Sequence, residues 1–418
     1  MSPSPRRNQG HEWAFALLVG GLLLVLSDLL VPPATAPFPG HGERFAGMVA
    51  DPFAFAGPFP QRVLWPLLAH AAGWFGIGPV ASSRLCSGAL LVVVCWFVRG
   101  RGAALGDAVL LTAAVAATGA VQVYKPMVCM TADTLNLLLL LLTLHHVDRP
   151  RVFWGLVALA TFSHEMVLFF GPWLWWQRLQ HGGSWWRDGL WLAACGAVHG
   201  GWRYSMRAAY DASYYAQNNF WVPWGLPALW LLFLLVVLAE FGPLLVAAVW
   251  GLCRGEHGLG GRLGPWLYAA TLLLLLVFAY DVMRFASFVV LPVLLAGGAM
   301  LRQPRGRAVA VALVAAAVAS YLWAHPVASE QGGRAFTEVS GAVLPLLPPS
   351  VFAGQRLSAG EGLDFLLALL RVAPGLWAWT AAAAAGVLVG GVLLARYAVP
   401  GPAKPKGGVP ATTTKASP

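Results

Sequence analysis

Apolar runs of about twenty residues recur along this chain, and no other feature constrains its fold as strongly. Runs such as 13–31 and 79–98 match the roughly 20 residues that a helix needs to cross a ~30 Å hydrocarbon core. Hydrophobic residues make up 58% of the 418 residues, charged residues make up 11%, and the mean hydropathy is +0.68. The sequence therefore predicts an all-α, polytopic transmembrane helical bundle.

We expect about ten full spans, plus a hairpin of two half-helices between residues 152 and 179 that is broken at the sequence FSHE. The predicted spans are 13–31, 79–98, 103–123, 127–147, 187–204, 226–252, 264–280, 285–300, 307–325 and 374–395. The first run has an alternative as a cleaved signal peptide, because Arg6 and Arg7 precede it. Its length and the presence of Asp28 within it favour a retained span.

The distribution of basic residues predicts the orientation. Most of the 27 basic residues fall in the connections that this topology assigns to one side, which the positive-inside rule identifies as the cytoplasm. Residues 1–12 then form a cytoplasmic N-terminal segment, 13–398 a transmembrane domain, and 399–418 a disordered cytoplasmic tail. The net charge of +10 is explained by this topology, so nucleic acid is not expected as a partner. The expected location is a bacterial inner membrane.

Two connections on the predicted outer side are long. The first, 32–78, contains apolar residues at helical spacing from 62 to 75, too few to span a bilayer. We expect an interfacial helix there, anchored by Trp65 and Trp74. The last outer loop, 326–373, carries charges typical of a solvated face.

Ionisable residues interrupt three apolar stretches, where such residues are rare and often functional. Asp133 lies within the predicted span 127–147, and its structural alternative is a hydrogen bond with Asn136. His164 and Glu165 lie at the FSHE break, where two half-helices could line a water-accessible cavity. The alternative there is a His–Glu pair that joins neighbouring helices.

Further charges collect on the same predicted side. Asp281 and Arg284 lie where two spans meet, and they either form a simple turn or belong to a site. Lys125 closes the outer end of the third predicted span. Arg62 begins the predicted interfacial helix, where it either caps the helix or contacts lipid headgroups, or else belongs to a site.

The chemistry of these groups suggests a reaction at the outer face. A carboxylate can deprotonate an acceptor hydroxyl, and arginine or lysine can bind a phosphate and stabilise its charge as it leaves. Apolar walls admit a lipid tail. Together these features suit transfer from a lipid-linked phosphosugar, although a proton-coupled transporter also needs buried acids and bases.

Four blocks of the sequence carry a resemblance to a known superfamily. They are ADPFAFAGPFPQRVLWPLLA (50–69), TADTLNLLLLLL (131–142), GLVALATFSHEMVLFFGPWL (155–174) and YDVMRFASFVVLP (280–292). In their order and spacing they resemble bacterial polytopic proteins related to the GT-C glycosyltransferase superfamily. The resemblance covers roughly residues 10–300 and implies a GT-C-like fold with an outer-face site for a polyprenyl-phosphate-linked sugar.

The resemblance also implies roles for particular residues. Asp51 and Glu43 are the candidates for the catalytic acid or base. Arg62, Lys125 and Arg284 would bind the donor phosphate. The implied pocket residues are His164, Glu165, Asp281 and Asp133. Asp28 lies inside the first span and the chain lacks a large outer domain, so the identity of the base and the recognition of the acceptor stay open.

Other searches of the sequence return no motif. There is no Walker loop, HExxH or GxSxG signature, and the five cysteines are isolated from one another, which supports neither a zinc site nor a disulfide framework. No cofactor or metal is therefore indicated, although a divalent metal is left open.

Two other classes of function compete with a transferase. The first is a transporter or flippase of a lipid-linked or small polar substrate, which predicts a polar path through Glu240, His164 and Asp133. The second is a non-catalytic envelope assembly protein, which predicts that Glu165 and Asp281 are each satisfied by structural partners. A transferase predicts that a carboxylate and a basic residue converge on one outer site.

Overall fold

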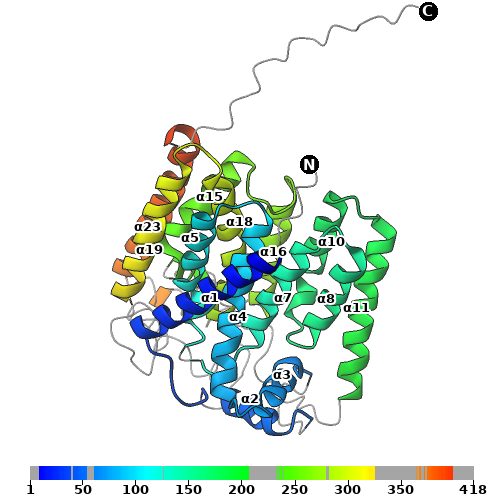
Figure 1. Cartoon of the computed structure of the whole chain (residues 1–418). Coiled ribbons are helices and arrows are strands. Elements are labelled where there is room, and N and C mark those ends of the chain that lie inside the picture. The colour runs from blue at the N-terminus through cyan, green and yellow to red at the C-terminus, as the bar shows by residue number, and fades with distance from the viewer. Residues whose placement is uncertain are drawn as a thin grey trace, which may run out of the picture.

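The computed structural model describes residues 9–38, 41–53, 61–125, 127–206, 233–234, 236–238, 240–278, 282–324, 364, 367–368, 371 and 374–398. Every regular element in these residues is a helix, and they contain no strand (Figure 1). The prediction of an all-α fold is confirmed for this part of the chain. The predicted outer loop 326–373 and the tail 399–418 lie almost wholly outside it.

The helices are packed into one bundle. In chain order they are α1 (Gln9–Leu30), α2 (His41–Ala50), α3 (Leu64–Gly73), α4 (Pro79–Gly100), α5 (Leu105–Ala116), α6 (Gly119–Gln122), α7 (Ala132–His145), α8 (Pro150–Thr161), α9 (Met166–Phe169), α10 (Gly171–Gln180), α11 (Trp185–Ser205), α15 (Leu245–Arg254), α16 (Gly264–Phe278), α17 (Val282–Ala286), α18 (Val290–Leu301), α19 (Gly306–Ala324) and α23 (Pro374–Leu393). Short 3-10 turns, η2 (Gly242–Leu244) and η3 (Ser287–Val289), precede α15 and α18, and a π-helical turn, η5 (Leu394–Ala398), follows α23.

Local sequence explains where several helices begin and end. Pro79, Pro150 and Pro374 are the first residues of α4, α8 and α23, where the fixed φ of proline suits a helix and its missing N–H costs nothing. Gly255 ends α15 with φ of 72°, the left-handed conformation that glycine adopts without strain.

Within the described residues, four helices are long and apolar enough to cross a membrane: Gly10–Leu30, Pro79–Gly100, Arg284–Leu301 and Thr380–Ala398. Other predicted spans contain shorter helices. The predicted span 103–123, for example, is divided between α5 and α6, because the chain turns at Thr118, whose hydroxyl donates to the Val115 carbonyl at 2.8 Å. The structure is thus compatible with a membrane protein, and the number of crossings stays a prediction.

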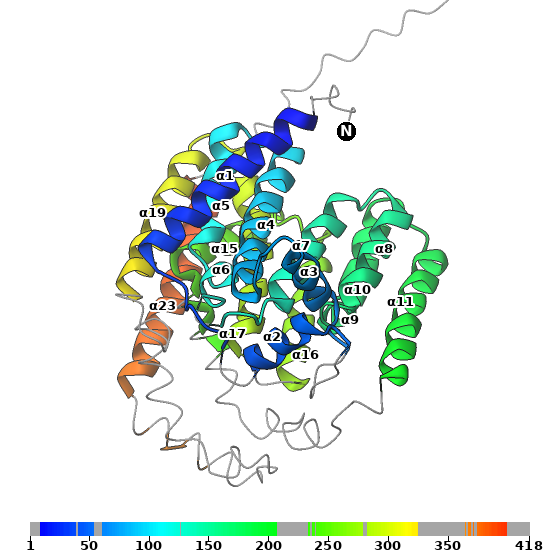
Figure 2. The ribbon, with the colours of Figure 1, turned by 60° about the horizontal axis from the view of Figure 1, so that its bottom comes forward.

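The arginine-rich connections lie together at one end of the bundle, which we call the basic end. Contacts that join these connections are Glu12–Arg99, Val147–Arg178, Trp173–Leu259, Glu256–Gln303 and Asp107–Arg307. The opposite end, which we call the distal end, holds α2, α3, α9 and the start of α7 (Figure 2). There the Leu64 amide donates to the Phe162 carbonyl at 3.0 Å.

Helices α8 and α10 form a hairpin around the FSHE sequence. Both outer ends of this hairpin lie at the basic end, since Arg178 near the end of α10 donates to the carbonyl of Val147, just before α8. The break itself lies at the distal end, where the Ser163 hydroxyl donates to the Ala132 carbonyl at 2.7 Å. The hairpin therefore returns to the end from which it started, and α11 begins there.

Helices α1 and α4 pack closely and run antiparallel. Ion pairs join them at both ends: Glu12 with Arg99 at the basic end, and Asp28 with Arg84 at the distal end. Between these pairs Gly20 permits the close approach, because a Cβ atom on it would stand 2.7 Å from the Val92 backbone nitrogen. Small residues at helix contacts are the usual way for membrane helices to pack.

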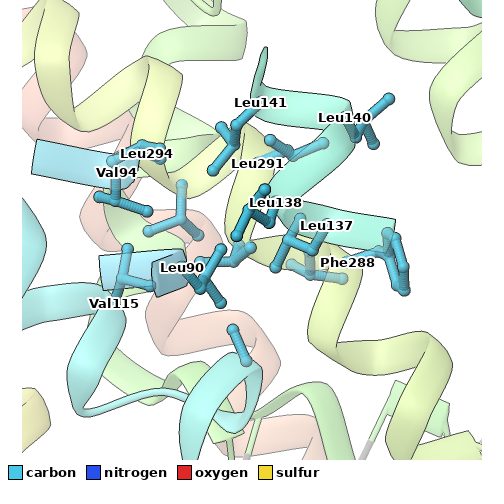
Figure 3. Close-up of a cluster of buried hydrophobic side chains, with 14 of the residues drawn as sticks. Leu90, Val94, Val115, Leu137, Leu138, Leu140, Leu141, Phe288, Leu291 and Leu294 are labelled. Atoms are coloured by element: carbon cyan, nitrogen blue, oxygen red, sulfur yellow. The ribbon is translucent and has the colours of Figure 1, made fainter. Parts of the chain in front are cut away.

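Aliphatic side chains fill the centre of the bundle. Figure 3 shows side chains from α4, α5, α7 and α18 pointing toward one another. Leu90 and Leu291 are fully buried there, and α7 contributes its leucine run. This core holds the start of α7 and the start of α18 in fixed positions at the distal end.

The predicted helix between residues 62 and 75 is present as α3, but one of its two expected anchors is misplaced. Trp74 is exposed, as an interfacial anchor requires, whereas Trp65 is only 2% exposed. Trp65 packs edge-on against Phe45 of α2, with ring centroids 6.3 Å apart. Trp65 therefore fixes α3 against α2, and its assignment as a membrane anchor is wrong.

Candidate functional site

Arg62 and Glu165 form a two-pronged ion pair at the distal end. The Arg62 Nε and Nη2 atoms donate to Glu165 Oε2 at 3.0 Å and to Oε1 at 2.7 Å. Parallel hydrogen bonds of this kind are among the strongest that side chains form. The pair connects Arg62, two residues before α3, to the break between α8 and α9, 103 positions further along the chain.

His164 lies between two carboxylates. Its Nδ1 atom accepts the Met166 N–H at 3.1 Å and stands 3.5 Å from Glu165 Oε2. Its Nε2 atom lies 3.4 Å from Asp133 Oδ1. Because Nδ1 accepts the Met166 N–H, its contact with Glu165 is not a hydrogen bond, whereas Nε2 faces both Asp133 and the donor Nη2 atom of Arg284.

Arg284 completes the arrangement from α17. Its Nε atom donates to Asp133 Oδ2 at 2.5 Å, and its Nη2 atom lies 3.3 Å from His164 Nε2. Asp133 is 1% exposed and Arg284 is 6% exposed, so this pair lies inside the protein. Charged pairs at such depth are stable only when both partners are present.

These five residues form one continuous chain of charged and polar contacts, which we call the ion chain. In order it runs Arg62, Glu165, His164, Asp133 and Arg284. With a neutral histidine, its two positive and two negative charges balance. The predicted partner of Asp133 was incorrect: the Asn136 amide instead donates to the His164 carbonyl at 3.4 Å, because Asp133 turns toward Arg284.

The predicted catalytic acids lie at the same end but are exposed. Glu43 is in α2, and Asp51 follows it, with its Oδ1 atom accepting the Phe53 N–H at 3.1 Å. The packing of Phe45 on Trp65 holds α2 beside α3, which begins two residues after Arg62. Glu43 therefore lies on α2 and Asp51 directly after it, next to α3, and none of the contacts described above joins either acid to the ion chain.

Lys125 belongs to a different cluster from Arg62 and Arg284. Its Nζ atom donates to the carbonyls of Ser27 at 2.5 Å and Val31 at 2.7 Å, and lies 3.4 Å from Asp28 Oδ1. It therefore caps the end of α1, and its predicted membership of one phosphate site with Arg62 and Arg284 is not seen. Arg84, the second partner of Asp28, was missed in the sequence, although a lone arginine within the apolar run 79–98 was a usable signal.

Two further predicted residues are Asp281 and Glu240. Asp281 lies outside the described residues. Glu240, proposed for a transport path, packs against the start of α6, where a Cβ atom on Gly119 would stand 1.9 Å from its Oε2 atom. The contacts described above do not join Glu240 to His164 or Asp133.

No group of three His, Cys, Asp or Glu side chains that could hold a metal ion occurs among the described residues. A small cavity between α5, α15, α18 and α19 is lined almost wholly by aliphatic side chains, with Thr118 as its single polar residue. Among the described residues, the ion chain links Arg62 to Arg284 through polar side chains. It can fix charge at the distal end and offer guanidinium groups to an anion.

Comparison with known proteins found no match to this chain among protein-family models, curated proteins or solved structures.

Proposed function

We propose that this protein is an integral-membrane glycosyltransferase that moves a sugar from a polyprenyl-phosphate donor to an acceptor at the distal end, which faces outward. The observation that carries the proposal is the convergence of Arg62 and Arg284. They come from chain positions more than two hundred residues apart and meet through one buried ion chain. Arginine is well suited to bind a phosphate and to stabilise its charge as the sugar leaves.

The carboxylates of the ion chain support this role by holding the arginines in place. Glu165 orients Arg62 through two hydrogen bonds, and Asp133 orients Arg284. A positioned cation loses little freedom when a ligand arrives, so binding costs less. Glu43 on α2 and Asp51 directly after it are exposed, so an acceptor hydroxyl can reach them, and one of them acts as the base.

A non-catalytic role in envelope assembly has one observation in its favour. Glu165 is fully paired with Arg62, as expected for a structural partner. The two functions differ in what they require of the arginines. A transferase needs them to hold a lipid phosphate, whereas an assembly protein needs them only for folding.

Native mass spectrometry in mild detergent separates these possibilities. The wild-type protein is expected to retain a polyprenyl phosphate more strongly than an uncharged-headgroup lipid of similar length. Arg62→Ala and Arg284→Ala should lose this preference. Arg178→Ala is the matched control, because Arg178 is equally buried and pairs with Asp188 at 3.2 Å, but lies at the basic end.

Two further variants guard against simple loss of folding. Arg62→Lys keeps the charge, and Arg62→Ala/Glu165→Ala removes the pair together and avoids a stranded carboxylate. If the double variant unfolds at the wild-type temperature and still binds the polyprenyl phosphate as wild type does, Arg62 is not a phosphate ligand and the transferase proposal loses its support.

The base is tested separately. Asp51→Asn and Glu43→Gln change exposed side chains, so their effect on stability should stay within about ±0.5 kcal/mol. In an assay with labelled polyprenyl-phosphate sugars, at least one of them should abolish transfer while retaining donor binding. Transfer at the wild-type rate in both variants would exclude these acids as the base.

A further inference from the structure

Two ion pairs join α1 and α4, and they differ in the number of cations that face the carboxylate. At the basic end, the described partner of Glu12 is Arg99, with Nη2 to Oε1 at 2.6 Å. At the distal end, Asp28 faces two cations: Arg84 through two hydrogen bonds, and Lys125 at 3.4 Å. The second cluster, which we call the α1-end cluster, therefore carries a net charge of about +1.

This excess charge is poorly solvated. The Lys125 side chain is 1% exposed and the Arg84 side chain 12% exposed. The helix-end carbonyls of Ser27 and Val31 accept hydrogen bonds from Lys125 and offset part of its charge. The Nη1 atom of Arg84, however, is buried and has no hydrogen-bond acceptor among the described residues. A buried donor of this kind is costly until an acceptor binds it.

The cluster also lies at the level of lipid headgroups when α1 spans a bilayer. Glu12 and Asp28 are ~24 Å apart along the helix, so the two ion pairs fall near the two boundaries of the hydrocarbon core. Around the cluster, Leu29, Leu30 and Leu85 are all more than half exposed. In a membrane these side chains contact acyl chains, so a phospholipid beside them places its phosphate at the level of the cluster.

Asp28 gives the cluster its access to the membrane. Its side chain is 27% exposed, more than that of Arg84 or Lys125. A headgroup phosphate that approaches along this edge passes Asp28, the most exposed member, and binds Arg84 by sharing its guanidinium with that carboxylate, with the charge of Lys125 behind it. Arginine binds phosphate oxygens through its planar set of N–H donors.

We propose that the α1-end cluster is a binding site for the headgroup phosphate of an anionic phospholipid, with Arg84 as the contact residue and Lys125 as the charge that favours an anion. The site is separate from the ion chain and independent of sugar transfer. Bound lipid would stabilise the packing of α1 on α4.

The test compares phosphatidylglycerol with phosphatidylcholine of the same acyl chains, by native mass spectrometry of the full-length protein in mild detergent. Arg84→Gln and Lys125→Met should weaken phosphatidylglycerol binding by about tenfold, or ~1.4 kcal/mol. Asp28→Asn should strengthen it, because this change raises the net charge of the cluster by one. Misfolding would not be expected to strengthen binding. The test therefore depends on weaker binding in Arg84→Gln and Lys125→Met together with tighter binding in Asp28→Asn.

The control replaces the pair at the other end, as Glu12→Gln/Arg99→Gln, and should leave lipid binding unchanged. Lipid held by the exposed arginines of the basic end, which none of these variants changes, is a background common to all of them. Equal binding by wild type and the three cluster variants would overturn the proposal. Displacement of the lipid by an equal concentration of inorganic phosphate would identify a soluble anion as the ligand, and would overturn the assignment to a lipid.

Discussion

His164 shows how the ion chain keeps two buried arginines charged within an apolar bundle. Its ring touches both carboxylates, yet its Nδ1 atom is occupied by the Met166 N–H, so it bridges the two pairs without adding charge. Each arginine is thereby neutralised by its own carboxylate. A phosphate that binds at this site must share guanidinium hydrogens with Glu165 or Asp133, which makes the carboxylates determinants of affinity as well as of folding.

The coupling within one pair gives the first prediction. Arg62→Met leaves Glu165 as a partly buried carboxylate without its arginine and should destabilise the protein by up to about 3 kcal/mol, the low end of the range for buried pairs. Arg62→Met/Glu165→Met removes both charges and should recover most of that loss. Thermal unfolding followed by tryptophan fluorescence checks this, and equal unfolding temperatures for Arg62→Met and wild type would show that the pair contributes little.

The second prediction concerns Lys125, which lies in the connection between α6 and α7. Burial is the main cause that lowers the pKa of Lys125 to about 8; Asp28 opposes this shift and Arg84 adds to it. The positive charge is therefore present below pH 8 and is lost as the pH rises through 8. Phosphatidylglycerol binding should weaken between pH 7 and pH 9 in the wild type and should change little in Lys125→Met. The same pH dependence in both proteins would assign the titration to another group.

The sequence was informative about which residues are unusual and less so about their partners. Charges within apolar sequence identified four of the five residues of the ion chain, and Arg62 was found by its position before a short helix. The pairing could not be predicted, because it depends on how α3, α7, α9 and α17 meet. Lys125 was grouped with Arg62 by its predicted side of the membrane, a criterion too coarse to separate two clusters at one end of a bundle.

At the scale of elements, close contact between α1 and α4 depends on glycine. Gly20 faces the α4 backbone at Val92, whereas its neighbour Gly21 has no atom within 4 Å of a Cβ position. Substitutions at Gly20 and Gly21 can therefore be compared directly, because the two glycines are neighbours in one helix and only Gly20 faces α4.

The third prediction uses this pair. Gly20→Leu should force α1 away from α4 and destabilise the protein by ~1–3 kcal/mol, the usual cost of overpacking. Gly21→Leu should leave the unfolding temperature unchanged, since its side chain would point into open space. A similar fall in both variants would indicate an effect of leucine on α1 itself, and would argue against the close packing of the two helices.

Helix positions were largely predictable because apolar runs and prolines mark them directly. Pro79 and Pro150 begin helices at or near the predicted boundaries. The turn at Thr118 and the burial of Trp65 were not predictable, since both depend on neighbouring helices that no local pattern reveals. The break at FSHE was expected from its charges, and the structure adds the reason it persists: Ser163 and His164 bond to α7 and α9 across it.

For the whole molecule, the hairpin of α8 and α10 decides at which end of the bundle every later helix begins. Because it enters and leaves at the basic end, α11 runs from the basic end to the distal end, where Trp202 donates to the Gln61 carbonyl at 3.2 Å. Every arginine-rich connection among the described residues then falls at the same end. If the hairpin crossed the bilayer once, the ends of all later helices would be exchanged.

The last prediction tests this arrangement with the native Cys253, which is exposed at the basic end. A membrane-impermeant maleimide should label Cys253 only after cells are permeabilised, because the positive-inside rule predicts a cytoplasmic basic end. Phe75 is 82% exposed at the distal end. Phe75→Cys in a Cys253→Ser background should be labelled in intact cells, and Cys253→Ser alone should show any background from the other cysteines. Labelling of Cys253 in intact cells would reverse the orientation, and would place the ion chain on the side of the membrane from which an outward-facing transferase could not work.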